Sequence, residues 1–324
     1  MNTRLHDLIL NPRIGRIALS LLAIVYVVYL AGFARFAINA FNPFSSGIVD
    51  HAVGAAPNIA LNYWTTDSMN SATSVDEQDN NPADFSQQNT QAQAVQQEGH
   101  PPVKGDASYP LSTVGRIFFT GPSGQNMSCS GTAVDSNNHS VVDTAGHCLY
   151  WNGGWVSNLI FCPLFDHGTT PYGCWAAQRL EVPADWIDAR PNDLHHDLGM
   201  AVVAPNDQGQ LTDVVGGAGW AYNQPTNSTF YAFGYPAAPP FDGLSRKSCD
   251  GAQGRSWQHA GGTVISIPCG MNGGSSGGPW FIKQGNNWYL SGHNDFSSSI
   301  QPGHMFSPYY DDTWHNLYEK AQNA

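Results

Sequence analysis

Between residues 115 and 291 the chain repeats one local pattern, in which a short apolar run ends at a cluster of glycine, proline or asparagine. Short, evenly spaced runs of this kind favour an all-β sandwich or barrel over alternating βαβ units. We expect strands over residues 115–120, 129–134, 140–142, 159–162, 199–203, 229–233, 263–268, 280–283 and 288–291, and a closing helix over 313–321.

The first 40 residues have the features of a targeting segment. Arg4, Arg13 and Arg16 precede an almost wholly apolar stretch over residues 17–34, which Arg35 closes. A cleaved signal peptide has an apolar core of about 7–15 residues and a spanning helix needs about 20. The stretch falls between these limits, so a signal peptide and a membrane anchor both stay open. Either one predicts export, as a secreted protein or one attached to the membrane by residues 17–34.

Residues 41–108 are expected to be a propeptide or linker. From Thr65 to Ala107 the composition shifts to Gln, Asn, Asp, Ser and Thr. So few apolar side chains cannot repay the entropy of ordering the chain, and we therefore expect disorder. The folded domain is assigned to residues 109–324, a length that suits one all-β unit, and the preceding segment suggests a zymogen.

Charge and cysteine content narrow the class of protein. The formal net charge is −12 and only 12% of residues are charged, which argues against a nucleic-acid partner. All six cysteines fall after residue 128. An even number in an exported domain indicates disulfides, and nearness favours Cys162–Cys174 and Cys249–Cys269, one choice among fifteen frameworks. Cysteine and histidine spacings typical of metal sites do not occur, so we expect no metal and no cofactor.

The segment Gly274–Pro279, Gly-Ser-Ser-Gly-Gly-Pro, has the composition of a nucleophile loop. A serine is a weak nucleophile and needs a general base, together with N–H donors for the oxyanion that forms. Glycines allow positive φ and leave no Cβ between the backbone and a substrate. Ser276 is the candidate nucleophile, and the N–H groups of Gly274 and Ser276 are the candidate oxyanion hole.

Two upstream motifs complete a recognisable set. Residues 144–148 read Thr-Ala-Gly-His-Cys, and residues 196–203 read His-Asp followed by an apolar run. Together with the serine motif, and in the order His, Asp, Ser, they resemble the trypsin-like, chymotrypsin-fold serine peptidases, with the bacterial and fungal glutamyl-endopeptidase-like branch most similar. The resemblance covers about residues 111–320.

Gly-Ser-Ser-Gly-Gly also fits the nucleophile elbow of the α/β-hydrolases. That fold requires a helix directly after the serine, and its acid and histidine further along the chain. Here Pro-Trp-Phe-Ile follows, which indicates a strand, and fewer than fifty residues remain. The architecture excludes this alternative.

The resemblance implies two six-stranded antiparallel β-barrels with the active site between them. His147 would be the general base and Asp197 the acid that orients it, while Ser276 comes from the second barrel. Asp193 and Asp143 are the competing acids; Asp193 lies in an expected loop, and Asp143 is very near His147 in sequence. The family also implies a bridge from Cys129 to Cys148.

Specificity is assigned to Gly270, Met271 and His293. In the family an aspartate six residues before the serine selects Arg or Lys, and this chain has Gly270 there. His293 falls about where glutamyl endopeptidases carry the histidine that contacts a substrate carboxylate. Those enzymes have a hydroxyl residue where this chain has Met271. Two interpretations stay open: acidic specificity, or His293 as a wall residue without a charge role.

We therefore predict an exported serine endopeptidase that acts on proteins or peptides through an acyl-enzyme, and we expect a monomer. The competing class is a protease-like binding module at the cell surface that has lost catalysis. The intact set of His147, Asp197, Ser276 and the glycine-rich loop favours the enzyme.

Overall fold

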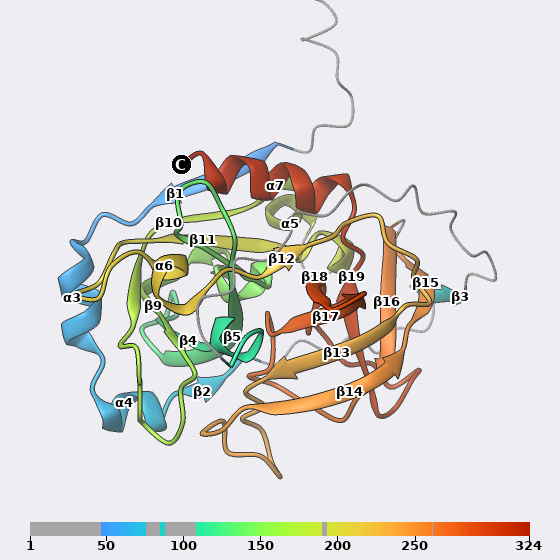
Figure 1. Ribbon diagram of the computed structural model, residues 1–324, viewed down its shortest axis with the longest axis horizontal. Coiled ribbons are helices and arrows are strands. Elements are labelled where there is room, and N and C mark those ends of the chain that lie inside the picture. Colours follow the sequence, from blue (N-terminus) through green and yellow to red (C-terminus); the bar gives the residue numbers. More distant parts are fainter. Residues whose placement is uncertain (1–46, 76–84, 88–107, 190–192, 261) are drawn as a thin grey trace, which may run out of the picture. The chain divides into compact units, whose positions relative to one another are not determined.

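The computed structural model describes residues 47–75, 85–87, 108–189, 193–260 and 262–324. These residues form a mostly β structure (Figure 1). The expected targeting segment, with its apolar residues 17–34, lies outside the described residues, as do residues 88–107 of the expected linker. Within the described ranges, no helix combines the length and the apolar character that crossing a membrane requires.

The first half of the catalytic region is a closed six-stranded antiparallel barrel. Its strands follow the order β10, β11, β6, β5, β4, β9, and β9 pairs with β10 to close the ring. The strands are β4 (Val114–Thr120), β5 (Asn126–Val134), β6 (Val141–Thr144), β9 (Ser157–Pro163), β10 (Trp175–Pro183) and β11 (Gly199–Val203). Ile117, Phe119 and Leu180 are wholly buried in its core.

The second half is built from two further sheets. One has the order β12, β18, β17, β13, β14, and the other has the order β19, β16, β15, β3. The strands are β3 (Phe85–Gln87), β12 (Gly219–Trp220), β13 (Thr229–Gly234), β14 (Lys247–Gln253), β15 (Arg255–His259), β16 (Gly262–Pro268), β17 (Pro279–Gln284), β18 (Asn287–His293) and β19 (His304–Pro308). The all-β prediction is confirmed, and the architecture is that of the chymotrypsin-like two-barrel fold.

The C-terminal helix α7 (Asp312–Gln322) packs across β10 and β11 (Figure 1). Trp314, Leu317, Tyr318 and Ala321 are buried, the helical spacing of one apolar face. The Asp311 side chain caps the helix by accepting a hydrogen bond from the Thr313 N–H at 2.8 Å. The remaining elements of this region are α5 (Ala184–Ala189), α6 (Leu211–Val215), the 3₁₀ helices η2 (Leu111–Thr113), η3 (Gly146–Cys148) and η4 (Leu194–His196), and the hairpin of β7 (Tyr150–Trp151) and β8 (Gly154–Trp155).

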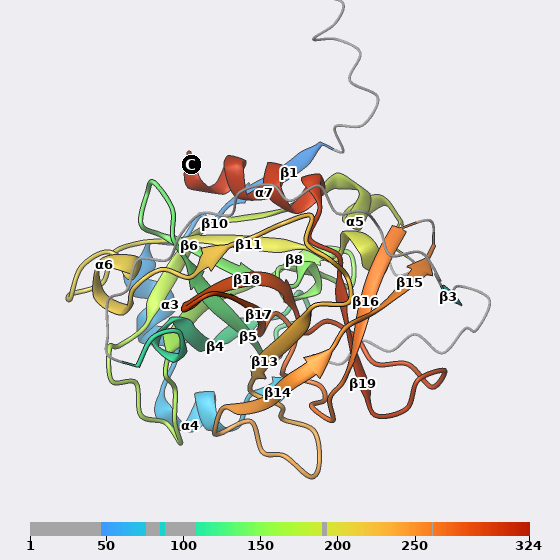
Figure 2. The same cartoon turned by 45° about the vertical axis from the view of Figure 1, so that its right-hand side comes forward.

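The segment before the catalytic region corrects the prediction of disorder. Residues 47–75 form β1 (Ile48–Ala52), α3 (Pro57–Tyr63), α4 (Thr66–Asn70) and β2 (Thr73–Ser74). β1 pairs with β10 (Figure 2), and β2 pairs in parallel with β5. The sparse apolar residues suffice because they are buried against the barrel: Trp64 packs on Phe118 with ring centres 5.4 Å apart.

Three disulfides connect the six cysteines. They join Cys129 to Cys148, Cys162 to Cys174, and Cys249 to Cys269. These are the neighbouring pairs that the sequence favours. The first ties β5 to η3, so it fixes the position of the segment that carries His147.

Candidate active site

The serine loop has the backbone that its glycines predict. Gly274 has φ +95° and Gly277 has φ +79°, both in the region that L-residues avoid. A Cβ on Gly277 would collide with Thr144 Oγ1. Ser276 is 3% exposed and stands between these two turns. The loop therefore approaches the first barrel so closely that only glycine fits at position 277.

Ser130, on β5, fixes this loop to the first barrel. Its backbone N–H donates to the Ser276 carbonyl at 2.8 Å, and its hydroxyl donates to the Gly274 carbonyl at 2.9 Å. The same hydroxyl accepts a hydrogen bond from the Tyr235 N–H at 2.8 Å. The first two bonds hold the carbonyl groups of Gly274 and Ser276, and the third ties Ser130 to Tyr235 in the second half of the domain.

His147 and Asp197 are joined twice. The His147 ring Nδ1 donates to Asp197 Oδ2 at 2.8 Å, and the His147 backbone N–H donates to Asp197 Oδ1 at 2.7 Å. His147 lies in η3, directly after β6, and Asp197 follows η4 and precedes β11. Both residues are fully buried. Because both carboxylate oxygens are engaged, the plane of the imidazole is fixed.

The competing acids lie elsewhere. Asp193 Oδ2 contacts the ring of His196 at 2.6 Å. The Asp143 carboxylate accepts hydrogen bonds from Trp314 Nε1 and the Tyr310 hydroxyl, each at 2.7 Å. Asp197 is therefore the acid that the fold pairs with His147.

Ser276 meets the histidine segment across the barrel interface. The Ser276 carbonyl oxygen lies 3.8 Å from Cys148 Sγ, the residue after His147. Ser276 Oγ donates over 3.4 Å to the carbonyl of Asp295. The structure therefore places Ser276 next to Cys148, the residue that follows His147, and it pairs His147 with Asp197.

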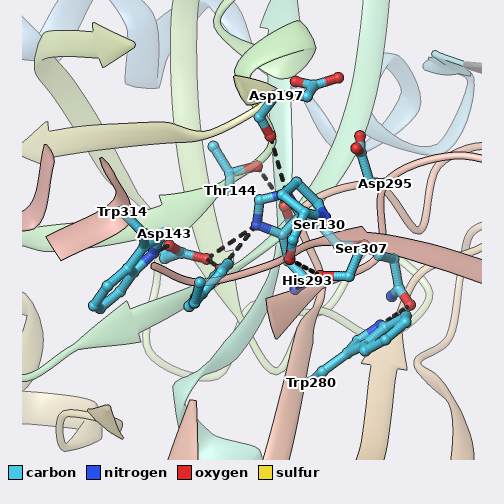
Figure 3. A network of polar contacts seen from close by, with 12 residues as sticks. Ser130, Asp143, Thr144, Asp197, Trp280, His293, Asp295, Ser307 and Trp314 are labelled. Atoms are coloured by element: carbon cyan, nitrogen blue, oxygen red, sulfur yellow. Dashed lines mark hydrogen bonds and ion pairs between the residues drawn. The ribbon is translucent and has the colours of Figure 1, made fainter. Parts of the chain in front are cut away.

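Asp295 is a site residue that the sequence reasoning missed. Its Oδ1 lies 3.5 Å from His147 Nδ1, and neither side chain is exposed. Figure 3 shows the Asp295 and Asp197 side chains at one end of the buried polar network. The only signal in the sequence is an aspartate two residues after β18, the second strand after the serine loop.

Two groups of side chains have the proximity of metal ligands. His147, Asp197 and Asp295 offer ligand atoms within 4.8 Å of one another, and so do Cys129, His147 and Cys148. The two cysteines of the second group form a disulfide and so offer no thiolate. The first group coincides with the His–Asp pair, whose ring N–H and carboxylate already satisfy each other.

A cavity of only about 10 Å³ adjoins Ser276. Its lining consists of Asn272, Gly273, Ser275, Ser276, Asp295, Phe296, Ser297 and Met305. None of the three expected specificity residues belongs to this lining. Gly270 is exposed, and Met271 is buried in an apolar cluster with Trp280 and Met305.

His293 does not line this cavity. Its Nδ1 contacts the Tyr310 hydroxyl at 2.8 Å, and its Nε2 contacts the Asp197 carbonyl at 3.1 Å (Figure 3). It is fully buried. Both ring nitrogens are engaged within the protein, so His293 has no donor left for a substrate carboxylate. It supports the backbone of Asp197 instead.

The sequence matches no family model and no curated protein. Solved structures do match. The protease Anisep from Arthrobacter nicotinovorans is 36% identical, with a TM-score of 0.61, and the match covers 69% of this chain and 99% of Anisep. The thermostable serine protease AL20 from an extremophilic microorganism is also 36% identical, with a TM-score of 0.59 and coverage of 66% and 98%. A Glu endopeptidase at 16% identity, TM-score 0.51 and coverage of 69% and 98% shares the fold.

This chain belongs to the chymotrypsin-fold serine peptidases. At 36% identity the match extends over nearly the whole of Anisep. By contrast, roughly a third of this chain has no counterpart in that protein. The match therefore spans nearly the whole length of a relative, and about a third of this chain lies outside it.

Proposed function

We propose that the chain is an exported serine endopeptidase in which Ser276 attacks the peptide carbonyl. His147 takes the hydroxyl proton and returns it to the leaving amine, and Asp197 holds the ring and stabilises the imidazolium. An acyl-enzyme forms on Ser276 and water then hydrolyses it. The N–H groups of Gly274 and Ser276 stabilise the oxyanion.

The observation that carries this proposal is the double hydrogen bond between His147 and Asp197 beside a glycine-flanked serine. A histidine whose Nδ1 is held by a carboxylate presents Nε2 as the base. This geometry favours a working enzyme over a binding module that has lost catalysis. The three disulfides support export, because disulfides persist in oxidising compartments. We propose that residues before the domain are a removable prosegment and that the mature enzyme acts as a monomer.

Two adjacent serines provide the test. Ser276→Ala should lose several orders of magnitude in kcat/KM on a peptide substrate, about 10⁶ in the best-studied case, and His147→Ala and the double variant should be similarly inactive. Ser275→Ala is the matched control, since its hydroxyl serves the turn by donating to the Asn272 carbonyl at 2.7 Å. Activity is measured on the full chain and after limited proteolysis of the segment before residue 108. Substantial peptidase activity in Ser276→Ala would refute the assignment.

A further inference from the structure

Asp295 is a buried carboxyl group without a conventional partner. Its side chain is wholly buried beside His147, and no donor among the described residues makes a hydrogen bond to either of its oxygens. Burying an ionised carboxylate without donors is strongly unfavourable, and such a group takes up a proton instead. The charge state of Asp295 is therefore set by its neighbours.

The nearest hydrogen-bond donors, the ring and backbone N–H groups of His147, already donate to Asp197. The ring N–H of His147 is 2.8 Å from Asp197 Oδ2 and 3.5 Å from Asp295 Oδ1, so Asp197 receives it. Two carboxylates this close cannot both ionise next to one neutral imidazole. Burial and the charge of Asp197 raise the pKa of Asp295 well above its ordinary value, and His147 opposes them.

We propose that Asp295 carries a proton at neutral pH and donates it to the Asp197 carboxylate. In this arrangement Asp197 holds the only negative charge of the pair, aimed at His147 Nδ1. Asp295 is a positioning residue that acts on the base through Asp197. The inference rests on the proposed roles of Asp197 and His147.

Asp295→Asn is the discriminating variant, because the amide keeps the shape and a donor but has no titrating proton. We expect kcat/KM to stay within about threefold of wild type, and the acid limb of the pH–rate profile to keep its midpoint. Asp295→Ala removes the donor. We expect it to lower kcat roughly tenfold with little change in KM, as loss of a hydrogen bond to a charged group does.

If Asp295 is instead ionised, the Asn variant removes an anion next to His147. The midpoint of the acid limb would then fall by about one pH unit or more, and the proposal would be wrong. Infrared difference spectra of Ser276→Ala against Ser276→Ala/Asp295→Asn test the proton without using activity. A protonated-carboxyl band must be present in the first protein and missing in the second; its absence from both overturns the proposal even if the enzyme is active.

A second observation, independent of Asp295, concerns residues 73–75. Thr73 and Ser74 pair with Met127 and Ser128 on β5, and the next residue, Val75, is 1% exposed. The Val75 carbonyl accepts a hydrogen bond from the Gly274 N–H at 3.2 Å. Gly274 is one of the two proposed oxyanion donors. The N-terminal segment therefore accepts a hydrogen bond from an N–H group that a substrate carbonyl would need.

The same segment also touches the other side of the serine. Residues 85–87 form β3 and pair with β15. The ring of Phe85 lies 6.2 Å from that of Phe296, which lines the cavity at Ser276. Ser276 and His147 are 3% and 0% exposed. The nucleophile and base are thus buried, and one N-terminal segment contacts both the Gly274 N–H and a residue that lines the cavity at Ser276.

Arg116 helps to hold this segment in place. The arginine is fully buried on β4, and its guanidinium donates to Ser128 Oγ at 2.9 Å and to the carbonyls of Met69 and Ala72 at 3.5 Å. Trp64 adds a hydrogen bond from Nε1 to the Asn158 carbonyl at 2.7 Å. Two backbone carbonyls of the segment therefore accept hydrogen bonds from a buried cation of the peptidase domain.

We infer that residues 73–75 and 85–87 act as an intramolecular inhibitor of the peptidase, with Val75 in the oxyanion hole. This deepens the proposed prosegment and rests on the assigned roles of Gly274 and Ser276. Inhibition should end when the segment is cut from the domain and diluted away.

The test uses the full chain with a site for an unrelated sequence-specific protease inserted between residues 100 and 105. We expect the uncut protein to react at least tenfold more slowly with a fluorophosphonate probe than the cut and diluted protein. Phe85→Ala and Val75→Asp should each raise the rate of the uncut protein. Ile59→Ala, an exposed position on α3, is the control and should not.

Equal reactivity before and after cleavage, with no effect of Phe85→Ala, would overturn the inference. Thermal unfolding of each variant shows whether Val75→Asp remains folded, and Phe85→Ala keeps the test valid if it does not. A cut protein that never reacts, in which Ser276 stays unlabelled, would count against the proposed function. If the uncut protein already reacts with the probe and cleavage does not speed the reaction, the inhibitor proposal is wrong while the proposed peptidase function stands.

Discussion

Trp314 Nε1 donates to Asp143 Oδ1 over 2.7 Å and so joins the C-terminal helix to β6, the strand that leads into His147. Asp143 also accepts from the Tyr310 hydroxyl, which contacts His293, and His293 reaches the Asp197 carbonyl. A buried polar chain thus runs from α7 to the acid that holds His147 (Figure 3). Interior networks of this kind fix one arrangement only when every member is satisfied.

Trp314→Phe should therefore affect both stability and activity. The variant removes the indole donor and leaves Asp143 with one partner fewer in a buried site. We expect a loss of about 1–3 kcal/mol in the free energy of unfolding, measured by urea denaturation, with reduced kcat. Trp155→Phe, at a half-buried hairpin position, is the control and should change both quantities much less. Equal effects of the two substitutions would count against the network.

The Cys129–Cys148 bridge should matter for catalysis beyond its effect on stability. It closes a loop with a sequence separation of 19 and holds the segment next to His147. Replacing both cysteines by serine should lower stability by about 3 kcal/mol and also lower kcat. The Cys162–Cys174 bridge, with a separation of 12, is the matched control. Its removal should lower stability by a similar amount and leave kcat unchanged below the unfolding temperature.

The His147–Asp197 pair and the glycine-rich serine loop could be predicted because each lies in a recognisable sequence motif. Ser276 has glycines that the tight turn requires, His147 follows an apolar strand, and Asp197 precedes one. Five of the six strands of the first barrel could be predicted for a similar reason, since these runs alternate with Gly, Pro and Asn clusters, whereas β10 was not among the expected strands. These are local signals.

Asp295 and the N-terminal segment could not be predicted in this way. Asp295 is separated from His147 by almost the whole second half of the domain, so their 3.5 Å approach follows from tertiary packing alone. Residues 47–75 are too polar for a core of their own, and become ordered by burying a few side chains, such as Trp64, on the barrel. His293 was assigned to the pocket because it falls about where glutamyl endopeptidases carry a histidine, but its contact with Tyr310 cannot be read from the local sequence.

Gly277 should tolerate no side chain. Its φ of +79° and the collision of a Cβ with Thr144 Oγ1 act together, so Gly277→Ala should displace the serine loop. We expect loss of nearly all activity. Gly285→Ala is the control for strain alone, because φ is +60° there and no atom lies within 4 Å of the added Cβ. That variant should lose about 1–2 kcal/mol of stability and stay active. An active Gly277→Ala enzyme would contradict the described loop geometry.

Glu181 should make the domain less stable as the pH rises toward neutrality. It is fully buried on β10, and neither carboxylate oxygen accepts a hydrogen bond from the described residues. Burial raises its pKa from 4.5 to about 7, although Lys320 and Arg179 oppose the shift. The folded state therefore holds this proton more tightly than the unfolded state does. The contribution of protonated Glu181 to the free energy of unfolding is therefore complete below pH 4.5 and is lost as the pH rises through about 7.

Glu181→Gln removes this titration, whereas Glu319→Gln, on the exposed side of α7, leaves it in place. Over the interval from pH 4.5 to 7, wild type and Glu319→Gln should lose unfolding free energy relative to Glu181→Gln. The slope of that difference can reach at most about 1.4 kcal/mol per pH unit. Urea unfolding at several pH values measures it. If the difference in unfolding free energy between wild type and Glu181→Gln is independent of pH over this interval, Glu181 is already ionised in the folded protein. The prediction of a raised pKa is then wrong.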